Sequence, residues 1–254
     1  MREQRLQALN EFIQAHQTVS LKTLALTFSV SLYTIRRDMD ELVARGQVRK
    51  HYGGVTAASL HNTFPIVYAE RVATLREEKQ RIALQAASDI QDHEVLYIDA
   101  GTTTLYMADL LKKRTVTVVT NSLPIIRDLA ASDTVELIAL GGHFDSRTAS
   151  FYGPTALETV ERFKFDKVFL GTSGLSIEHG LTNYTELEAA LKRAVMQRGN
   201  RCYVLVDHSK LGRDSLYRIG PLSHADVLVT DQLLPPLLAQ YCEKHTIEVR
   251  HKLV

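Results

Sequence analysis

The sequence has 254 residues but no tryptophan, only two cysteines and only six prolines. So little cysteine excludes a disulfide-stapled scaffold, and because Cys202 and Cys242 lack metal-ligand or redox spacing, we expect both to be buried free thiols. Long apolar runs are also absent: stretches such as HADVLVTD are too short to cross a membrane, and the N-terminal residues lack the apolar centre of a signal peptide. These absences predict a cytoplasmic protein that does not enter a membrane, and no pattern predicts a metal or another cofactor.

The composition that is present is typical of a globular protein, with 45% hydrophobic and 23% charged residues. The length fits one large domain or two modest ones. Charge differs along the chain: residues 1–60 hold eight Lys and Arg against five Asp and Glu, whereas the remainder holds 22 against 24. A positive excess this small indicates a nucleic-acid partner only weakly, so the placement of the charges decides.

Apolar residues recur at helical spacing in three successive stretches, which predicts three helices within the first sixty residues. The first lies within residues 2–16, and the second follows Ser20, which is a plausible N-cap. The third follows a second cap at Ser31 and ends where Gly46 supplies a left-handed residue. Its inward-facing residues are expected to be Ile35, Met39, Leu42 and Val43.

The outward face of this third helix carries two adjacent arginines near its start. The residues on that face are Leu32, Tyr33, Thr34, Arg36 and Arg37. A helix-turn-helix presents the N-terminal residues of its second helix to the major groove of DNA, where arginine binds guanine or phosphate with two hydrogen bonds. The alternative is that the arginines only solvate the surface and pair with Asp38, Asp40 or Glu41.

The stretch QVRKHYGGVTA that follows predicts a two-stranded wing that turns at Gly53 and Gly54. Such a wing carries basic side chains toward phosphates. The predicted DNA-binding residues are therefore Ser31, Tyr33, Thr34, Arg36, Arg37, Arg49, Lys50 and His51.

The segment VSLYTIRRDMDELVARGQVRKHYGGV resembles the N-terminal winged helix-turn-helix of DeoR-type repressors of sugar metabolism. The family signature has the form S..TIRRDL..L...G...R.HGG. The matching positions are Ser31, Thr34, Ile35, Arg36, Arg37, Asp38, Leu42, Gly46, Gly53 and Gly54. Met39 replaces a leucine, and Lys50-His51-Tyr52 stands where many members have a basic residue directly before His-Gly-Gly. The resemblance implies a repressor that binds double-stranded operator DNA.

Residues 1–57 are thus predicted to form the winged helix-turn-helix, residues 58–67 a small and polar linker, and residues 68–254 a second domain. A long amphipathic helix is expected over residues 67–90, with Leu84 turned inward and Lys79 outward. Six short apolar runs then alternate with helical stretches: EVLYIDA, TVTVVTN, VELIALGG, DKVFLGTSG, RCYVLVDHS and ADVLVTD. This alternation predicts an α/β fold with a doubly wound, mainly parallel sheet.

Polar and glycine residues follow these runs, at the carboxyl ends of the predicted strands. Parallel sheets bind their ligands at this end. DAGTTT after the first run offers hydroxyls and backbone N–H groups to an anion, but it matches neither a Walker loop nor GxGxxG, so nucleotide binding is not predicted. Lys210 adds a positive charge, and Asp99 or Asp207 accepts from sugar hydroxyls, which fits a phosphorylated sugar. The alternatives are an ordinary threonine-capped turn, a Lys210 that only neutralises Asp207 or a surface carboxylate, and a surface ion pair between Glu188 and Lys192.

The resemblance to the DeoR-type family continues over residues 68–232, through DAGTT, VTNS, LGG, GTSGL, ELEAALKRAV and DHSKLGR. The sensor domain of that family resembles the sugar-phosphate isomerase fold. The resemblance implies an effector site at Asp99, Gly101, Thr102, Thr103, Asn121, Gly142, Glu188, Asp207 and Lys210. The intervening stretch HFDSRT places Arg147 where we expect effector specificity to reside.

The sequence thus predicts a transcriptional repressor of a carbohydrate-metabolism operon, controlled by a phosphorylated sugar or polyol. A homo-oligomer, either a dimer or a tetramer, is expected because one winged helix contacts little DNA. The alternative is a sugar-phosphate isomerase-like enzyme with a DNA-binding head, in which Asp99, Glu188 and Lys210 supply the base and the cation. No close pair of carboxylates is visible in the sequence, so no catalytic residue is assigned.

Overall fold

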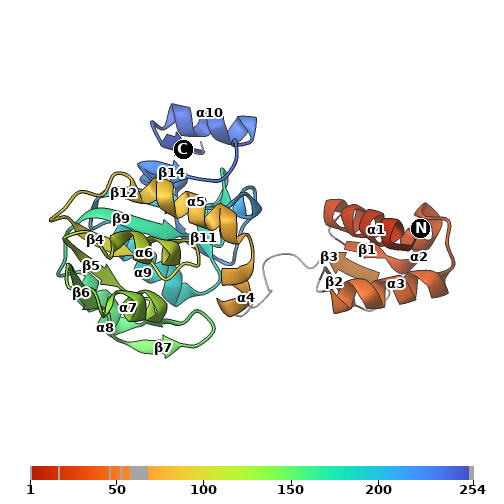
Figure 1. Cartoon of the computed structure of the whole chain (residues 1–254). Coiled ribbons are helices and arrows are strands. Elements are labelled where there is room, and N and C mark those ends of the chain that lie inside the picture. The colour runs from red at the N-terminus through yellow and green to blue at the C-terminus, as the bar shows by residue number, and fades with distance from the viewer. Residues whose placement is uncertain (1, 17, 46, 52–53, 58–67, 252–254) are drawn as a thin grey trace. The chain divides into compact units, whose positions relative to one another are not determined.

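The computed structural model describes residues 2–16, 18–45, 47–51, 54–57 and 68–251. The chain separates into two compact units, Met1–Phe64 and Pro65–Val254 (Figure 1). The predicted linker, 58–67, lies outside the described residues, as do Gly46 and Gly53 of the predicted helix end and wing turn. These features therefore stay predictions.

In its described residues, the first unit has three helices and a small antiparallel sheet. In chain order the elements are α1 (Arg2–His16), β1 (Thr18–Ser20), α2 (Leu21–Thr27), α3 (Leu32–Ala44), β2 (Val48–His51) and β3 (Gly54–Ala57). The wing strands β2 and β3 pair as predicted, and β1, which the sequence does not predict, adds to β3 on its other side. This third strand fastens the wing to the segment between α1 and α2.

The predicted helical stripes form the core of the first unit. Its fully buried residues include Leu6, Leu9, Ile13, Leu24, Ile35, Met39 and Leu42. The prediction for Val43 is wrong, because its side chain is 39% exposed. It follows the buried Leu42 directly, and one residue turns the helix by about 100°, which carries Val43 off the buried face.

Serine caps begin both helices of the helix-turn-helix, as predicted. Ser20 Oγ accepts a hydrogen bond from the backbone N–H of Thr23 at 3.0 Å, and Ser31 Oγ accepts one from Thr34 at 3.1 Å. Each cap satisfies one backbone donor that the first helical turn leaves unpaired. The caps therefore fix where α3 starts, and with it which side chains its first turn presents.

The second unit is built on a seven-stranded sheet whose neighbouring strands all pair in parallel. The strands are β4 (Val95–Ile98), β5 (Val116–Thr120), β6 (Val135–Ala139), β9 (Phe165–Gly171), β12 (Gly199–Leu205), β14 (Val227–Val229) and β15 (Glu248–Arg250). Six of them are the predicted runs; the seventh, β15, is too short and polar to give an apolar run. The order across the sheet is β15-β14-β12-β9-β4-β5-β6, so the direction of winding reverses between β4 and β9.

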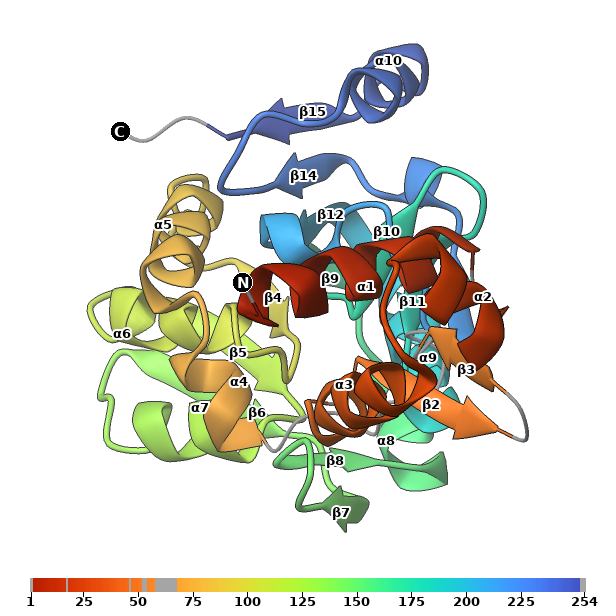
Figure 2. The same cartoon turned by 90° about the vertical axis from the view of Figure 1, so that its right-hand side faces the viewer.

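Helices cover both faces of this sheet, which confirms the doubly wound architecture (Figures 1 and 2). On one face lie α5 (Arg76–Ala87), α6 (Met107–Leu111) and α7 (Leu123–Leu129). On the other lie α8 (Pro154–Val160), α9 (Glu186–Met196) and α10 (Pro236–Lys244). Successive strand residues alternate between the two cores: Leu96 and Ile98 pack under α5 and α6, whereas Tyr97 packs on the opposite side.

The helix expected over residues 67–90 is divided in two. A short helix, α4 (Tyr68–Ala73), precedes α5, and Leu75 between them adopts a left-handed conformation with φ of 51°. The prediction that Leu84 turns inward is also wrong, since its side chain is 53% exposed. The left-handed Leu75 therefore ends the regular helix that the sequence predicts as continuous.

Two small antiparallel additions are not predicted by the sequence. One is a hairpin of β7 (His143–Asp145) and β8 (Ser150–Tyr152), and the other is a three-stranded sheet of β10 (Gly174–Ser176), β11 (Gly180–Asn183) and β13 (Tyr217–Gly220). Single turns of 3-10 helix, η1 (Thr104–Tyr106), η2 (His208–Lys210) and η3 (Leu222–His224), follow β4, β12 and β13. Of these segments, η1, β10 and η2 directly follow the carboxyl ends of β4, β9 and β12.

Among the described residues, no helix is both long and apolar enough to cross a bilayer. Cys202 and Cys242 are buried free thiols, as predicted.

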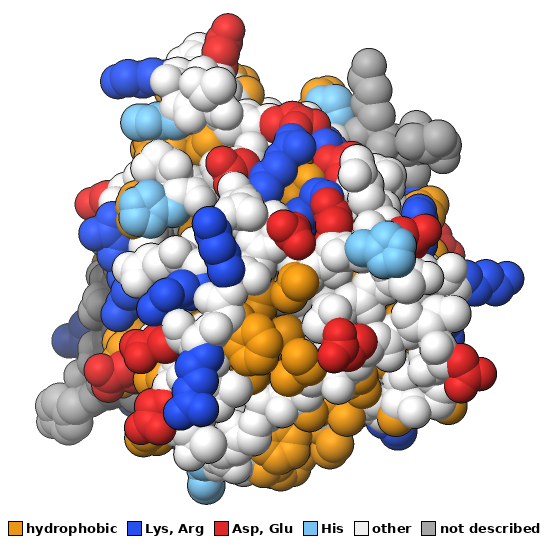
Figure 3. All heavy atoms as spheres, turned by 90° about the vertical axis from the view of Figure 1, so that its left-hand side faces the viewer, with side chains coloured by type: hydrophobic (Ala, Val, Ile, Leu, Met, Phe, Trp, Pro, Cys, Tyr) orange, Lys and Arg blue, Asp and Glu red, His pale blue; other side chains and the backbone are white. Residues whose placement is uncertain are grey.

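On the face shown in Figure 3, acidic and basic side chains are interspersed around a hydrophobic patch. A surface of mixed sign does not track a DNA backbone, which needs clustered positive charge.

Candidate functional site

The start of α3 presents an exposed polar surface. Tyr33 is 77% exposed, and both Arg36 and Arg37 are exposed. Within the described part of the chain, neither arginine makes a hydrogen bond or an ion pair with another side chain. A long cationic side chain without a partner is available to an external anion.

The nearby acids on α3 are all engaged elsewhere. Asp38, which is 1% exposed, accepts a hydrogen bond from Arg5 of α1 at 2.7 Å, and Asp40 pairs with Lys50. Glu41 pairs with Arg45 at 3.1 Å. Arg36 and Arg37 therefore do not pair with these carboxylates, and their exposure fits both solvation of the surface and binding to DNA.

The other predicted DNA-binding residues differ in their surroundings. Ser31 caps α3, and its Oγ lies 2.9 Å from Oγ1 of Thr34. Lys50 is on β2, held by Asp40. Arg49 and His51 also belong to β2, of which the structure describes the backbone but not these two side chains. The surface that the structure does describe is therefore the first turns of α3.

The second candidate site is a cavity of about 120 Å³ at the carboxyl ends of β4, β9 and β12. It lies where the winding of the sheet reverses, the position at which open α/β sheets bind ligands. It is lined by Arg71, Thr74, Leu75, Lys79, Ala100, Gly101, Thr102, Thr103, Gly171, Thr172, Ser173, Asn183, Tyr184, Glu188, Lys192, Leu205, Val206, Asp207, Ser209 and Lys210. Six of the predicted effector residues are among them: Gly101, Thr102, Thr103, Glu188, Asp207 and Lys210.

The ends of β4 and β9 approach each other closely beneath this cavity. A Cβ atom on Gly101 would lie in ordinary contact with Cα of Gly171, at 3.5 Å, and would crowd Oγ1 of Thr104, at 3.0 Å. The Thr104 hydroxyl, at 2.6 Å from the carbonyl of Asp99 and 2.8 Å from that of Gly101, closes the loop after β4. The DAGTTT motif is thus a compact turn whose Thr102 and Thr103 border the cavity.

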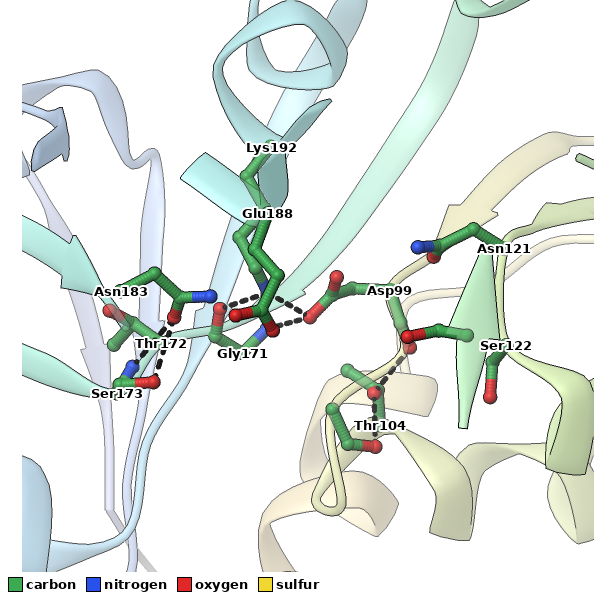
Figure 4. Close-up of polar contacts among 12 residues, drawn as sticks. Asp99, Thr104, Asn121, Ser122, Gly171, Thr172, Ser173, Asn183, Glu188 and Lys192 are labelled. Atoms are coloured by element: carbon green, nitrogen blue, oxygen red, sulfur yellow. Dashed lines mark hydrogen bonds and ion pairs between the residues drawn. The ribbon is translucent and has the colours of Figure 1, made fainter. Parts of the chain in front are cut away.

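A buried ion pair forms the floor. Asp99 and Lys192 are 1% and 4% exposed and pair directly, and Asp99 also accepts a hydrogen bond from the Gly171 N–H at 3.1 Å. Lys192 donates in addition to the Gly171 carbonyl at 2.9 Å. Figure 4 shows Lys192 and Glu188 pointing from α9 toward Asp99. The pair therefore binds α9 to the junction of β4 and β9.

Glu188 does not pair with Lys192 on the surface, so that alternative is wrong. The carboxylate is 7% exposed and accepts hydrogen bonds from the hydroxyls of Tyr152 at 3.2 Å and Thr185 at 3.0 Å. The spacing of four residues does place Glu188 and Lys192 on one face of α9, but that face is turned to the cavity rather than to water.

Three further cationic side chains border the cavity: Arg71 of α4, Lys79 of α5 and Lys210 of η2. Burial lowers the pKa of Lys79 to about 8, with nearby Lys210 and Arg71 adding to the fall and Asp207 opposing it. Burial likewise lowers the pKa of Lys210, against the attraction of Asp207. The prediction that Lys79 faces outward is wrong, because its side chain is 4% exposed. Burial and mutual repulsion make this cluster receptive to an anion.

Lys210 does not simply neutralise Asp207. The Asp207 carboxylate accepts hydrogen bonds from the backbone N–H of Ser209 at 3.0 Å and from the Ser209 hydroxyl, and so caps η2. Within the described residues, Lys210 forms no ion pair or hydrogen bond through its ammonium group. Its charge is left for a ligand.

Four predicted effector residues are not among the residues that line the cavity. Asp99 reaches the floor only through its ion pair with the lining residue Lys192. Asn121 is buried, where it accepts a hydrogen bond from the Tyr97 hydroxyl at 3.0 Å and donates one to the Phe151 carbonyl at 3.1 Å. Gly142 has φ of 137° and packs against the backbone of Tyr152. Their roles in this structure are to support the site from below and beside it.

Arg147 is the fourth of these residues. It is exposed in the β7–β8 hairpin and binds Asp145 with two hydrogen bonds, at 2.7 and 3.1 Å. The Asp145 carboxylate raises the pKa of Arg147 accordingly. A two-point pair with its own hairpin holds the guanidinium away from the cavity.

Sequence reasoning missed several lining residues, above all Arg71, Lys79 and Lys192. Lys79 and Lys192 lie in helical stretches rich in charge, where a lysine normally faces water. The available signal was the unusually apolar neighbourhood of Lys192 in ELEAALKRAV. No signal in the sequence marks Arg71.

Two solved structures have a distant similarity to this chain. A D-ribose-5-phosphate isomerase, solved in complex with phospho-erythronic acid, matches with a TM-score of 0.40 and 20% identity over 54% of each chain. The eIF2B beta subunit of Chaetomium thermophilum matches with a TM-score of 0.43 and 17% identity over 61% of this chain and 50% of that one. Both likenesses are distant.

Relatives in sequence extend over the whole chain. The HTH-type transcriptional regulator IolR of Bacillus subtilis (strain 168) is 36% identical over 250 residues, 98% of this chain and 99% of that protein. The glycerol-3-phosphate regulon repressor of Escherichia coli (strain K12) is 33% identical over 247 residues, 97% of each. The family descriptions "DeoR-like helix-turn-helix domain" and "DeoR C terminal sensor domain" match residues 5–60 and 75–232. The chain therefore belongs to the DeoR family of transcriptional regulators.

Proposed function

We propose that this chain represses a carbohydrate-metabolism operon and that a phosphorylated sugar or polyol, bound in the cavity of the second unit, controls it. The observation that carries the ligand class is the group of three cations, Arg71, Lys79 and Lys210, beside the hydroxyls of Thr102 and Thr103. A phosphate monoester brings nearly two negative charges and three acceptor oxygens at pH 7, which suits this group. The names of the relatives, which include a glycerol-3-phosphate regulon repressor, support the same class.

The remaining polar groups of the cavity suit the carbohydrate part of such a ligand. Asp207 and Glu188 offer carboxylate oxygens to hydroxyl groups. Asn183 accepts from the backbone N–H and the hydroxyl of Ser173 through one side-chain oxygen, at 3.1 and 2.9 Å, which leaves its NH₂ group for a ligand oxygen. A cavity of about 120 Å³ favours a compact ligand.

On the DNA side, we propose that Tyr33, Arg36 and Arg37 reach base edges and phosphates while the wing contacts the backbone through Arg49, Lys50 and His51. One such unit covers a short half-site, so we propose a dimer or tetramer that reads paired half-sites. Sedimentation of the chain with and without operator DNA tests this assembly. A DNA-binding regulator of this kind works in the cytoplasm.

We favour sensing over catalysis because the chain carries a DNA-binding unit and because Asp99, one of the two carboxylates considered as a base, is buried in an ion pair with Lys192. An ion pair with a lysine makes a carboxylate a weaker base. Turnover of pentose or hexose phosphates in a coupled assay, at rates proportional to the amount of chain, would support the enzyme instead.

The test of the proposed function is a titration of the whole chain against a labelled fragment of its own upstream region. It is made at two salt concentrations, with and without a panel of sugar and polyol phosphates. We expect sequence-specific binding that weakens steeply with salt and is released by one compound. Specific binding that no phosphorylated compound alters would contradict the ligand class, and no specific binding would contradict the regulator.

Replacing Lys210 with methionine should weaken binding of the phosphorylated ligand by roughly 10- to 100-fold, because a charge-assisted hydrogen bond contributes about 1.5–3 kcal/mol. Binding to operator DNA in the absence of ligand should be unchanged. Calorimetry with the compound found in the titration measures the affinity. Lys244→Met, which removes an exposed lysine of α10, is the matched control and should bind the ligand normally.

The affinity for a phosphate monoester should also fall by about tenfold between pH 7 and pH 9, because Lys79, with a pKa of about 8, loses its proton in this range while the phosphate stays a dianion. The charged groups around it are Asp207, Lys210, Arg71 and Glu78. In Lys79→Arg the guanidinium stays charged, so the fall should be much smaller. An affinity that is constant from pH 7 to pH 9 in the unaltered chain would contradict this role of Lys79.

A further inference from the structure

The helix α4 is attached to the second unit in an unusual way. None of its residues is buried. Among the described residues, the hydrogen bonds that join it to the structure beyond Leu75 all end on backbone carbonyls of residues 71–74. Tyr106 donates to the Val72 carbonyl at 3.1 Å, and Lys79 donates to the carbonyls of Arg71 and, at 2.7 Å, Thr74. A short helix held this way is expected to open at little cost.

Two of these three bonds come from a side chain of the ligand cavity. The Lys79 ammonium lines the cavity and at the same time holds the end of α4. An ammonium group has three hydrogens, so two carbonyls leave one for a ligand anion. The left-handed Leu75 interrupts the helix between α4 and α5, and Arg71, on the α4 side of this break, is among the residues that line the cavity.

Arg71 is poorly satisfied in its present surroundings. Its Nε atom is buried and has no hydrogen-bond partner in the described part of the chain. Its guanidinium stands 5.8 Å over the ring of Tyr68, whose own hydroxyl is likewise buried without a partner. The charge of Arg71 also repels those of Lys79 and Lys210. A buried donor without an acceptor is unfavourable, and like charges add to this.

We propose that Arg71 binds the anionic group of the effector, and that this contact fixes α4 in place and so couples the cavity to the DNA-binding unit. The inference rests on the proposed function and adds the regulation of the same site. An anion between Arg71, Lys79 and Lys210 turns their repulsion into attraction and gives the Arg71 guanidinium an acceptor. The helix that becomes fixed begins at Tyr68, directly after the predicted linker at 58–67. The ligand thereby acts on the chain where it enters the second unit.

The coupling is reciprocal, as linkage requires. If binding of the anion favours the docked form of α4, then any change that undocks α4 must weaken binding of the anion. Tyr106→Phe is such a change, because it removes the hydrogen bond to Val72 and Tyr106 does not line the cavity. We expect this variant to bind phosphate more weakly than the unaltered chain.

Hydrogen exchange of the full chain, read by mass spectrometry, tests the proposal with inorganic phosphate as the probe. Calorimetry first gives the concentration that saturates each variant. At saturation, amide exchange in residues 68–74 should slow by roughly tenfold in the unaltered chain and stay unchanged in Arg71→Ala. Arg213→Ala, which removes an exposed arginine whose charge also reaches Lys210, is the matched control and should keep the effect.

Two results would overturn the inference while leaving the proposed function intact. One is saturating phosphate that protects residues 100–104 but not residues 68–74. The other is an Arg71→Ala variant in which residues 68–74 are protected as in the unaltered chain. If calorimetry detects no binding of phosphate or of any phosphorylated sugar, the proposed ligand class fails, and the inference fails with it.

Discussion

Replacing Arg36 and Arg37 together with alanine should weaken binding to the chain's own upstream DNA by about a hundredfold or more. Each arginine that makes a two-point contact with guanine contributes about 1–3 kcal/mol of discrimination. Both side chains are exposed on the first turns of α3 and lack an internal partner among the described residues, so the free chain loses nothing by their removal. Arg37→Ala alone should weaken binding to this DNA by about tenfold. Fluorescence anisotropy with a labelled fragment measures these losses.

The thermal unfolding of the double variant should match that of the unaltered chain. Arg45→Ala is the matched control, since it removes an arginine at the other end of α3 that pairs with Glu3 and Glu41. It should bind DNA almost normally, because an exposed ion pair contributes only about 0–1 kcal/mol to stability. If the double variant keeps full affinity for the specific fragment, α3 is not the element that reads the operator.

Breaking the buried ion pair should have the largest effect on stability. Lys192→Met leaves Asp99 charged and buried, and Asp99→Asn leaves Lys192 in the same position; each should destabilise the second unit by about 3–5 kcal/mol. Urea unfolding followed by tyrosine fluorescence measures this loss. The chain has no tryptophan and eight of its ten tyrosines lie beyond residue 67, so the signal reports mainly on the second unit.

The double variant, Asp99→Asn with Lys192→Met, should lose much less than the two single losses added together, because neither charge is then left alone. Lys167→Met provides the comparison: Lys167 pairs with Glu94, but these side chains are 10% and 18% exposed and stay closer to water. It should cost less than Lys192→Met. Additive losses in the double variant would show that Asp99 and Lys192 do not stabilise each other.

An element of this structure could be predicted from the sequence when the residues that determine it lie close together in the chain. The three helices of the first unit follow from apolar spacing and from serine caps within a few residues, so Ser31 already marks the start of α3. The six predicted strands follow from their own apolar runs. By contrast, β1 and β15 have three residues each, and their pairing partners β3 and β14 make them strands.

The residues of the candidate cavity could likewise be predicted only where they lie close to a predicted strand. Thr102, Thr103 and Lys210 directly follow predicted strands, so topology alone brings them together. Lys192 was expected to pair with Glu188, four residues away, but its partner is Asp99, 93 residues away in the chain. A spacing pattern identifies a shared helical face, but it does not tell whether that face meets water or a buried carboxylate. Arg71 is a stronger case, because it lies in α4, beyond the break at Leu75 that divides the helix predicted over residues 67–90.

The order of the strands has a consequence for how the chain is made. β4 and β9 are neighbours at the centre of the sheet, yet β9 starts 70 residues after β4. A ribosome that adds about 5–20 residues per second needs roughly 4 to 14 seconds to cover that distance. During this time β4, β5 and β6 can pair, but the inner edge of β4 stays open. Each nascent chain therefore exposes an apolar strand edge to the other nascent chains on the same mRNA. Slower translation between β6 and β9 should lengthen this exposure and increase aggregation of the nascent chains.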